Sequence, residues 1–313
     1  MARYERRNEL GGLFRIGTRG SPLALAQAHM VRDALLAAHG WAADQVAIVP
    51  VKTTGDRVQD RPLAEIGGKA LWTKELDRAL LDREIDCAVH SMKDVETIRP
   101  ASIAIAAMLP RADVRDRLIG ADSVAALPDG ATIGTSSPRR AAQLRNLRPD
   151  LKITLFRGNV DTRLGRLAAG EADATLLAAA GLERLGRHDL GTPIEIETML
   201  PAPAQGAIGI EVLTAEETTR RLIAAIDDAA TSTCVMAERA LLAALEADCH
   251  SPVAALATLG TGLRIEAALF SNDGRDCVTG HIEGAADDVT IGARLARDLL
   301  DRAPPAICAL FTG

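Results

Sequence analysis

Residues 133–145 read IGTSSPRRAAQLR, and residues 16–27 read IGTRGSPLALAQ. Each copy joins a short apolar stretch, a Gly-Thr turn and a Ser-Pro pair. Serine caps helix N-termini and proline suits the first helical position, so we predict one strand–turn–helix unit, used twice. A helix start of this kind presents backbone N–H groups and the positive end of the helix dipole, which favours anions.

The rest of the chain extends these two units. Strand and helix patterns alternate over residues 13–109 and restart over residues 113–200, which predicts two α/β lobes. Residues 206–226 contain GAIGIEV, a strand without a partner of its own, and we assign it to the first lobe. Residues 229–313 read as a helix, three strands and a helix, a small α+β domain. Two crossings between similar lobes predict a hinge around a cleft.

Composition narrows the possible ligands. The 313 residues carry a net charge of −6, yet residues 130–187 hold ten Lys/Arg against five Asp/Glu. A local basic region in an acidic chain favours a small anionic ligand. Aromatic residues make up 2 %, too few for the stacking surfaces of nucleic-acid binders, so we expect no nucleic-acid partner.

The sequence also indicates a compartment. Residues 1–12 are charged, and no apolar run approaches the roughly 18 residues of a membrane span, so we expect no secretory signal and no membrane association. The five cysteines are odd in number and lack Cys-x-x-Cys spacing, which argues against a disulfide framework and a structural zinc site. We therefore expect a cytoplasmic protein.

Several arginines lie at predicted strand-to-helix junctions. The first copy adds one and the second adds two, and the RGNVDTRL and GLERLG stretches contribute three more: Arg19, Arg139, Arg140, Arg157, Arg163 and Arg184. Arginine binds carboxylates through two parallel hydrogen bonds, so this set suggests a ligand with many carboxylates. Ordinary helix capping with solvated arginines is the alternative.

Two further stretches contain reactive side chains. In VHSMKDV a predicted buried strand ends at Ser91, Lys93 and Asp94, where Asp94 could act as an acid or base or stabilise a cation. A solvated Lys–Asp pair is the alternative, and His90 reads as a core histidine. In EADCHSPVAA, Cys249 falls in a turn, where a thiol is accessible to act as a nucleophile, whereas the other cysteines read as buried thiols.

Seven ordered motifs and the loop at Cys249 resemble the porphobilinogen deaminase family over essentially the whole chain. The motifs are IGTRGSPLALAQ, GGKALWTKEL, AVHSMKDV, IGTSSPRRAAQL, RGNVDTRL, AAAGLERLG and QGAIGIE. The resemblance implies two lobes like type II periplasmic binding proteins and a third domain with the cysteine loop. It implies an enzyme that joins four porphobilinogens into hydroxymethylbilane with loss of ammonia, on a dipyrromethane cofactor held by a thioether to Cys249.

The resemblance also implies roles for individual residues, with Asp94 as the catalytic carboxylate. Those implied to contact the cofactor are Ser91, Lys93, Asp94, Thr135, Ser137, Arg139, Arg140 and Arg163. Those implied to hold substrate or chain carboxylates are Arg19, Ser21, Arg157 and Arg184. Lys69, beside the loop 55–68, is expected in a mobile lid.

The sequence departs from the family's usual pattern at three places. Asp248, His250 and Ser251 replace common neighbours of the cysteine, and we expect them to affect loading of the cofactor. Pro203-Ala204 precedes Gln205 where glycine is usual, which would stiffen that hinge. Val95-Glu96 stands where Val-Pro is common.

Two other classes of protein have similar features. A non-catalytic two-lobed receptor for a small anion would have the same lobes and arginines, but it needs neither Cys249 nor the Lys93-Asp94 pair. A metal enzyme using Cys234, Cys249 and His250 has ligand spacing that matches no standard pattern, so we expect no metal. We expect a monomer.

Overall fold

The structure is a computed structural model of the 313-residue chain, and it describes residues 13–52 and 73–311. The chain divides into two compact units. Unit 1 comprises Met1–Arg111 and Ala207–Ser232, and unit 2 comprises Ala112–Gly206 and Thr233–Gly313. The predicted cleft concerns how the lobes are placed and stays a prediction, as do the domain bounds.

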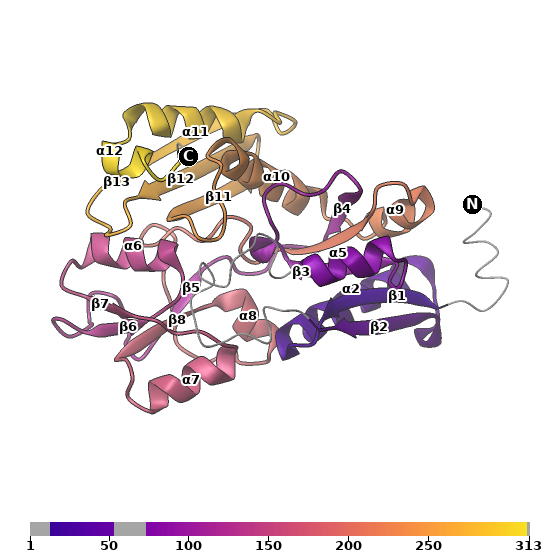
Figure 1. Cartoon of the computed structure of the whole chain (residues 1–313), viewed down its shortest axis with the longest axis horizontal. Helices are drawn as coiled ribbons and strands as arrows, with labels where there is room; N and C mark the ends of the chain where they lie inside the picture. Colours follow the sequence, from indigo (N-terminus) through magenta and orange to yellow (C-terminus); the bar gives the residue numbers. More distant parts are fainter. Residues whose placement is uncertain (1–12, 53–72, 312–313) are drawn as a thin grey trace. The chain divides into compact units, whose positions relative to one another are not determined.

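Unit 1 is built on a five-stranded sheet in the order β2-β1-β3-β10-β4 (Figure 1). Its strands are β1 (Phe14–Arg19), β2 (Val46–Val51), β3 (Cys87–Ser91), β4 (Ile103–Met108) and β10 (Ile208–Leu213). Its helical segments are α2 (Pro22–His39), η1 (Ala43–Gln45), α5 (Lys74–Leu81), η2 (Met92–Asp94) and α9 (Glu217–Ala224).

The connections in unit 1 follow from local signals. Ser21 caps α2, Pro22 is its first residue, and Gly40 ends it with φ of 63°, a conformation that glycine adopts without strain. β1 runs parallel to β2 and β3, whereas β10 runs antiparallel to both β3 and β4. The GAIGIEV segment therefore returns to the first sheet, as its sequence indicated.

The N-terminal part of unit 2 repeats this plan, with a sheet in the order β7-β6-β8-β5-β9. Its strands are β5 (Asp116–Ile119), β6 (Thr132–Gly134), β7 (Lys152–Thr154), β8 (Ala174–Ala178) and β9 (Thr192–Pro193). Its helices are α6 (Pro138–Leu147), α7 (Val160–Ala168) and α8 (Ala179–Arg184). The fourth strand is again antiparallel to its inner neighbour, because β5 pairs antiparallel with β8.

The C-terminal sheet of unit 2 is antiparallel, in the order β11-β12-β13. Its strands are β11 (Val253–Leu259), β12 (Leu263–Phe270) and β13 (Cys277–Gly284), with helices α10 (Ala229–Ala244), α11 (Ile291–Arg302) and α12 (Pro305–Cys308). Side chains alternate between the faces of a strand. Odd-numbered residues such as Val253, Ile265 and Leu269 pack with α10 and α11 in one core.

The opposite face of the C-terminal sheet meets α6. Ala254, Ala268 and Phe270 form a separate buried cluster with Ala142 of that helix. The part of the C-terminal sheet next to α6 is therefore apolar on both faces, which explains the nearly continuous apolar runs of β11 and of the end of β12, whereas Glu266 and His281 on the same face are exposed.

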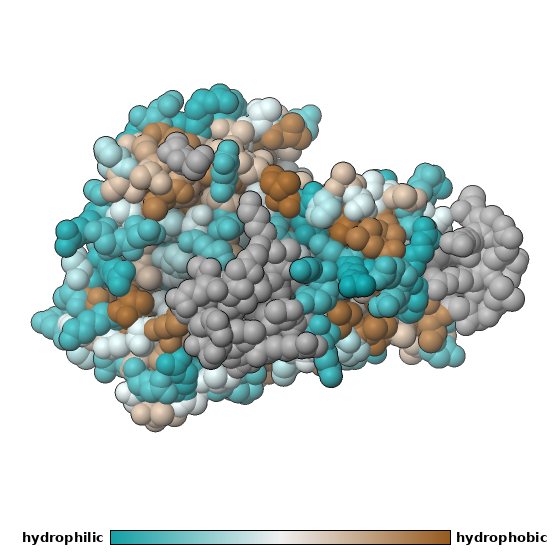
Figure 2. Space-filling view, in the orientation of Figure 1, coloured by the Kyte–Doolittle hydropathy of each residue, from teal (hydrophilic) through white to brown (hydrophobic). Residues whose placement is uncertain are grey.

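The predicted fold class, two α/β lobes and a small α+β part, is confirmed by these three sheets. Six short elements were not predicted: β5, β9, α9, α12 and the 3-10 segments η1 and η2. Within the described residues, no helix is long and apolar enough to span a membrane. On the face in Figure 2, hydrophobic residues form separate patches among hydrophilic ones, which is usual for a protein surface.

Candidate functional site

The first copy of the repeat places its polar residues at the carboxyl end of β1. The Oγ of Ser21 accepts the backbone N–H of Ala24 at 3.3 Å, and the buried Thr18 hydroxyl donates to the Ala24 carbonyl at 3.2 Å. Arg19 and Ser21 are half-buried there. This end of a parallel sheet is where open α/β folds bind ligands.

The predicted catalytic residues lie on the neighbouring strand of unit 1. β3 ends at Ser91, whose Oγ accepts the Gln27 side-chain amide at 2.7 Å. In the 3-10 turn that follows, Met92 is buried, whereas Lys93 and Asp94 are half-buried. A Cβ on Gly209 of β10 would lie 2.0 Å from the Met92 sulfur, so glycine there lets Met92 anchor the turn.

A buried network of charged residues lies around the end of β3 and the turn that follows it. Arg99 donates to Glu211 at 2.7 and 3.0 Å, to Glu96 at 2.7 Å and to Asp77 at 2.5 Å. The ring Nε2 of His90 lies 3.1 Å from a Glu211 carboxylate oxygen. His90 is 6 % exposed, so its prediction as a core histidine is confirmed.

The network fixes the charge of its innermost carboxylate. Burial alone would raise the pKa of Glu211, but His90 and Arg99 lower it to about 2. It also explains one departure from the family pattern. Glu96, which stands where proline is common, accepts hydrogen bonds from Arg99 and from the Thr73 hydroxyl.

In unit 2 the second copy is capped like the first. The Ser137 side chain accepts the N–H of Arg140, and the buried Thr135 hydroxyl accepts the N–H of Ser137 at 3.2 Å. Both predicted caps, Ser21 and Ser137, are therefore confirmed. Arg139 and Arg140 then lie in the first turn of α6.

These two arginines form a buried cluster with Asp116 of β5. The carboxylate oxygens of Asp116 accept one N–H from Arg139 and one from Arg140, each at 2.7 Å. Gln205 donates to the same carboxylate at 2.9 Å. The two arginines are 3 % and 5 % exposed. The alternative of solvated arginines therefore does not hold at these two positions.

The charges in this cluster do not balance. Burial alone would raise the pKa of Asp116, but Arg139 and Arg140 hold it well below its usual range, so this carboxylate is ionised. Two guanidinium groups and one carboxylate leave an excess of one positive charge in a buried setting. A buried excess charge is costly unless an anion compensates it.

Four guanidinium N–H groups in unit 2 are buried without a hydrogen-bond partner among the described residues. They are Nε of Arg139, Arg140 and Arg184 and one terminal nitrogen of Arg157. Burial lowers the pKa of Arg184 to about 10, although it donates to the Gly206 carbonyl at 2.6 Å. Orphaned buried donors are rare and often mark a missing ligand or ion.

The remaining predicted residues of unit 2 are more exposed. Arg163, on α7, is half-buried and donates to the Gly158 carbonyl at 3.2 Å. Cys249 is exposed in the turn between α10 and β11, as predicted. Asp248 and Ser251 organise that turn, because Asp248 accepts the N–H of His250 at 2.8 Å and the Ser251 Oγ accepts the N–H of Asp248 at 3.2 Å.

Two models of known families match the chain in sequence. "Porphobilinogen deaminase, dipyromethane cofactor binding domain" matches residues 14–221, and "Porphobilinogen deaminase, C-terminal domain" matches residues 232–301. The chain belongs to the porphobilinogen deaminase family. It is a transferase of tetrapyrrole biosynthesis that polymerises pyrroles and uses a dipyrromethane cofactor.

Named relatives cover nearly the whole chain. The porphobilinogen deaminase of Sphingopyxis alaskensis is 59 % identical over 95 % of this chain and 96 % of its own length. That of Paracoccus denitrificans is 53 % identical over 93 % and 94 %. Among solved structures, substrate-binding domain 2 of Lactococcus lactis GlnP is 14 % identical, with a TM-score of 0.42 over 74 % of this chain and 90 % of that chain.

The structure thus collects the predicted residues of this porphobilinogen deaminase into two groups. Unit 1 carries Arg19, Ser21, Ser91, Lys93 and Asp94, and unit 2 carries Thr135, Ser137, Arg139, Arg140, Arg157, Arg163, Arg184 and Cys249. Lys69 lies outside the described residues. No group of three or more His, Cys, Asp or Glu among the described residues is arranged to hold a metal ion.

Three residues at these sites were not found from the sequence. Asp116 lies in a run of alternating charges, RADVRDRLIG, that looks like a solvated loop. Arg99 and Glu211 are separated by 112 positions, so no local pattern joins them.

Proposed function

We propose that this enzyme joins four porphobilinogens head to tail into hydroxymethylbilane, with Cys249 as the cofactor attachment point and Asp94 as the catalytic carboxylate. The cofactor would be held by Ser91, Lys93, Asp94, Thr135, Ser137, Arg139, Arg140 and Arg163. Substrate carboxylates would be held by Arg19, Ser21, Arg157 and Arg184, and Lys69 would belong to a lid. A cytosolic location and a monomeric state are our predictions from the sequence.

The observation that carries this proposal is the set of orphaned guanidinium N–H groups in unit 2. Dipyrromethane built from two porphobilinogens carries two acetates and two propionates, so it needs several cationic donors. Arg139 and Arg140 supply unused Nε–H groups and one excess positive charge, and Arg157 and Arg184 add two further buried donors. The residues present therefore fit a ligand with several carboxylates.

The role of Asp94 follows from the charge that the reaction creates. Loss of ammonia from porphobilinogen leaves an electron-poor methylene-pyrrole cation. An ionised carboxylate beside the pyrrole N–H would stabilise that cation and could accept the proton released when the ring regains its aromatic state. The turn that holds Asp94 is anchored on one side by buried Met92 and leaves the carboxylate half-exposed, where substrate can reach it.

Cys249 supplies the tether. Its sulfur would form a bond to the methylene carbon of a porphobilinogen as the C–N bond breaks, and the thiol proton would leave with the amine as ammonia. When bound, dipyrromethane supplies the pyrrole carbon to which the first substrate is joined. A thiol suits this attachment because cysteine is the most nucleophilic common side chain near neutral pH, and Cys249 is exposed.

The proposal is tested by following porphobilinogen consumption and ammonia release in wild type, Asp94→Asn and Asp44→Asn. Asp44 is an exposed aspartate of the same unit and serves as the matched control. We expect Asp94→Asn to keep the fold and the bound dipyrromethane but to lose about 100-fold or more in kcat, as when a charge-stabilising group is removed. Near-normal turnover would exclude Asp94 from the mechanism.

A further inference from the structure

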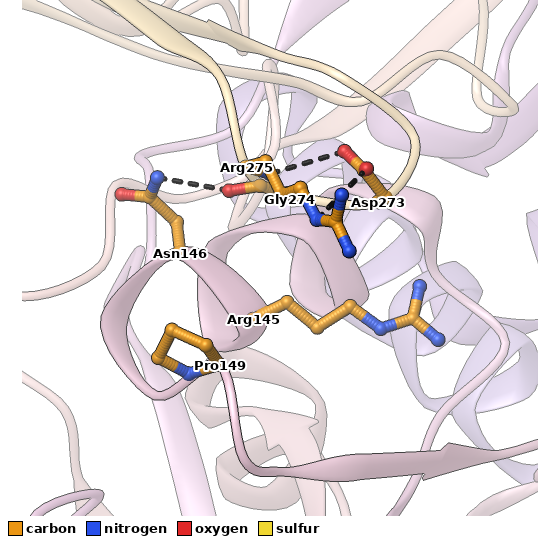
Figure 3. A pocket seen from close by; sticks show the side chains of 6 residues that line it. All are labelled: Arg145, Asn146, Pro149, Asp273, Gly274 and Arg275. Carbon is orange, nitrogen blue, oxygen red and sulfur yellow. Dashed lines mark hydrogen bonds and ion pairs between the residues drawn. The ribbon is translucent and has the colours of Figure 1, made fainter.

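The C-terminal sheet is joined to the helix that carries Arg139 and Arg140. The turn between β12 and β13, residues 271–276, lies against the last turns of α6, and the side-chain amide of Asn146 donates to the Gly274 carbonyl at 2.9 Å (Figure 3). Arg145 adds a longer bond to the Asn272 carbonyl at 3.4 Å. We call this contact between the turn and α6 the α6 joint.

Gly274 makes the closest approach in the joint. Its φ is +76°, and a Cβ placed there would lie 2.5 Å from the Ala142 carbonyl oxygen and 2.8 Å from the Arg145 Cβ. Both neighbouring groups belong to or adjoin the helix backbone and cannot swing aside. A side chain at position 274 would therefore push the turn away from α6.

Hydrogen bonds within the turn hold its shape, so we expect such a displacement to be passed on to the sheet. The Ser271 Oγ donates to Asp273 at 2.7 Å and accepts the N–H of Asp276 at 3.0 Å, and Asp273 also accepts the N–H of Arg275. Beside the close contact the surfaces part, leaving a pocket of about 450 Å³ (Figure 3). Gly274 lines this pocket together with Arg145 and Asn146 of α6.

The joint continues along α6 toward its arginines. Ala142 packs with Ala254 and Phe270 of the C-terminal sheet. One helical turn from Ala142, Arg139 donates to the Leu200 carbonyl at 2.7 Å. The next carbonyl, that of Pro201, accepts the N–H of Ala255 on β11 at 3.1 Å.

Cys249, just before β11, and Arg139 and Arg140, on α6, are therefore both next to the packed contact between the C-terminal sheet and α6. β11 begins four residues after Cys249, and its second and third residues are Ala254 and Ala255. We propose that the α6 joint is a positioning device, with Gly274 as its key residue, that fixes Cys249 at a set distance from Arg139 and Arg140. This inference rests on the proposed function, because it assumes that those three residues hold the dipyrromethane.

The test compares Gly274→Ala with Gly170→Ala. Gly170 has nearly the same φ, +75°, but no atom lies within 4 Å of the position that its Cβ would take. Both variants should lower the thermal unfolding midpoint by a few degrees, because alanine is strained in this conformation. Only Gly274→Ala should also lower the fraction of chains carrying dipyrromethane by intact mass, and lower kcat about 10- to 100-fold with little change in KM.

Equal dipyrromethane load and equal kcat in the two variants would overturn the proposal. If Gly274→Ala does not fold, Asn146→Ala decides, since it removes the hydrogen bond to Gly274 without adding atoms. If Asn146→Ala lowers the fraction of chains carrying dipyrromethane and lowers kcat at an unchanged unfolding midpoint, the proposed role of the α6 joint is supported. Wild-type values of both quantities overturn the proposal. A wild-type protein without the dipyrromethane mass would instead refute the proposed function.

Discussion

Asp116→Asn is the change whose cost can be worked out most fully from the structure. The carboxylate is 1 % exposed and accepts two guanidinium N–H groups at 2.7 Å and one amide N–H at 2.9 Å. Asparagine keeps the shape but removes the charge, and its amide N–H₂ would face a guanidinium donor. The buried excess charge would rise from one to two.

Breaking a buried ion pair by removing one partner costs about 3–5 kcal/mol, because the remaining charge stays buried without compensation. We expect a loss of this size in the free energy of unfolding. It is a large part of the roughly 5–15 kcal/mol that stabilises a typical domain. The matched control is Asp298→Asn, since Asp298 pairs with Arg302 at the surface and should cost under about 1 kcal/mol.

The assay is urea unfolding at neutral pH, followed by circular dichroism. An Asp116→Asn protein within about 1 kcal/mol of wild type would refute the buried cluster. If Asp116→Asn does not fold, the triple variant Asp116→Leu/Arg139→Met/Arg140→Met decides. Apolar residues of similar volume can replace a buried ion triad with little loss or a gain. The triple variant should therefore fold but carry no dipyrromethane, and full loading would show that the arginines serve stability alone.

Three further changes test neighbouring parts of the account. The pKa of Glu211 is lowered from 4.5 to about 2, so its stabilisation is full above pH 4.5 and is lost as the pH falls toward 2. The expected loss in the free energy of unfolding of wild type over this pH range is about 3 kcal/mol. The free energy of unfolding of Glu211→Gln, measured with urea, should change less over the same range. Arg99→Met leaves three carboxylates without their cation and should cost about 3–5 kcal/mol by the same assay, whereas an unchanged midpoint would contradict the network. Arg184→Gln should raise KM for porphobilinogen at least about tenfold, with Arg187→Gln as the control, since half-buried Arg187 pairs with Asp161 instead, and an equal KM in both would remove Arg184 from the substrate site.

The local signals in the sequence were sufficient for most of the fold. Ser21 and Ser137 are helix caps whose effect depends on neighbouring residues only, and the two strand–turn–helix units were predicted from them. The exposed position of Cys249 also follows from its place between a helix and a proline-closed turn.

The long-range partners could not be predicted from the sequence. Asp116 lies 23 residues before Arg139, on a four-residue strand. The alternating charged residues around it are typical of an exposed loop. Nothing local indicates that both arginines turn inward to this carboxylate. Gly274 likewise reads as an ordinary turn glycine, and only the approach of α6 explains why no side chain fits there.

Intact mass spectrometry of the purified wild type, Cys249→Ser and Cys308→Ser tests whether dipyrromethane is bound through Cys249. We expect wild type and Cys308→Ser to carry an excess equal to two porphobilinogens less two ammonias, and Cys249→Ser to carry none. An unmodified wild-type chain, or the same excess on Cys249→Ser, would contradict this expectation.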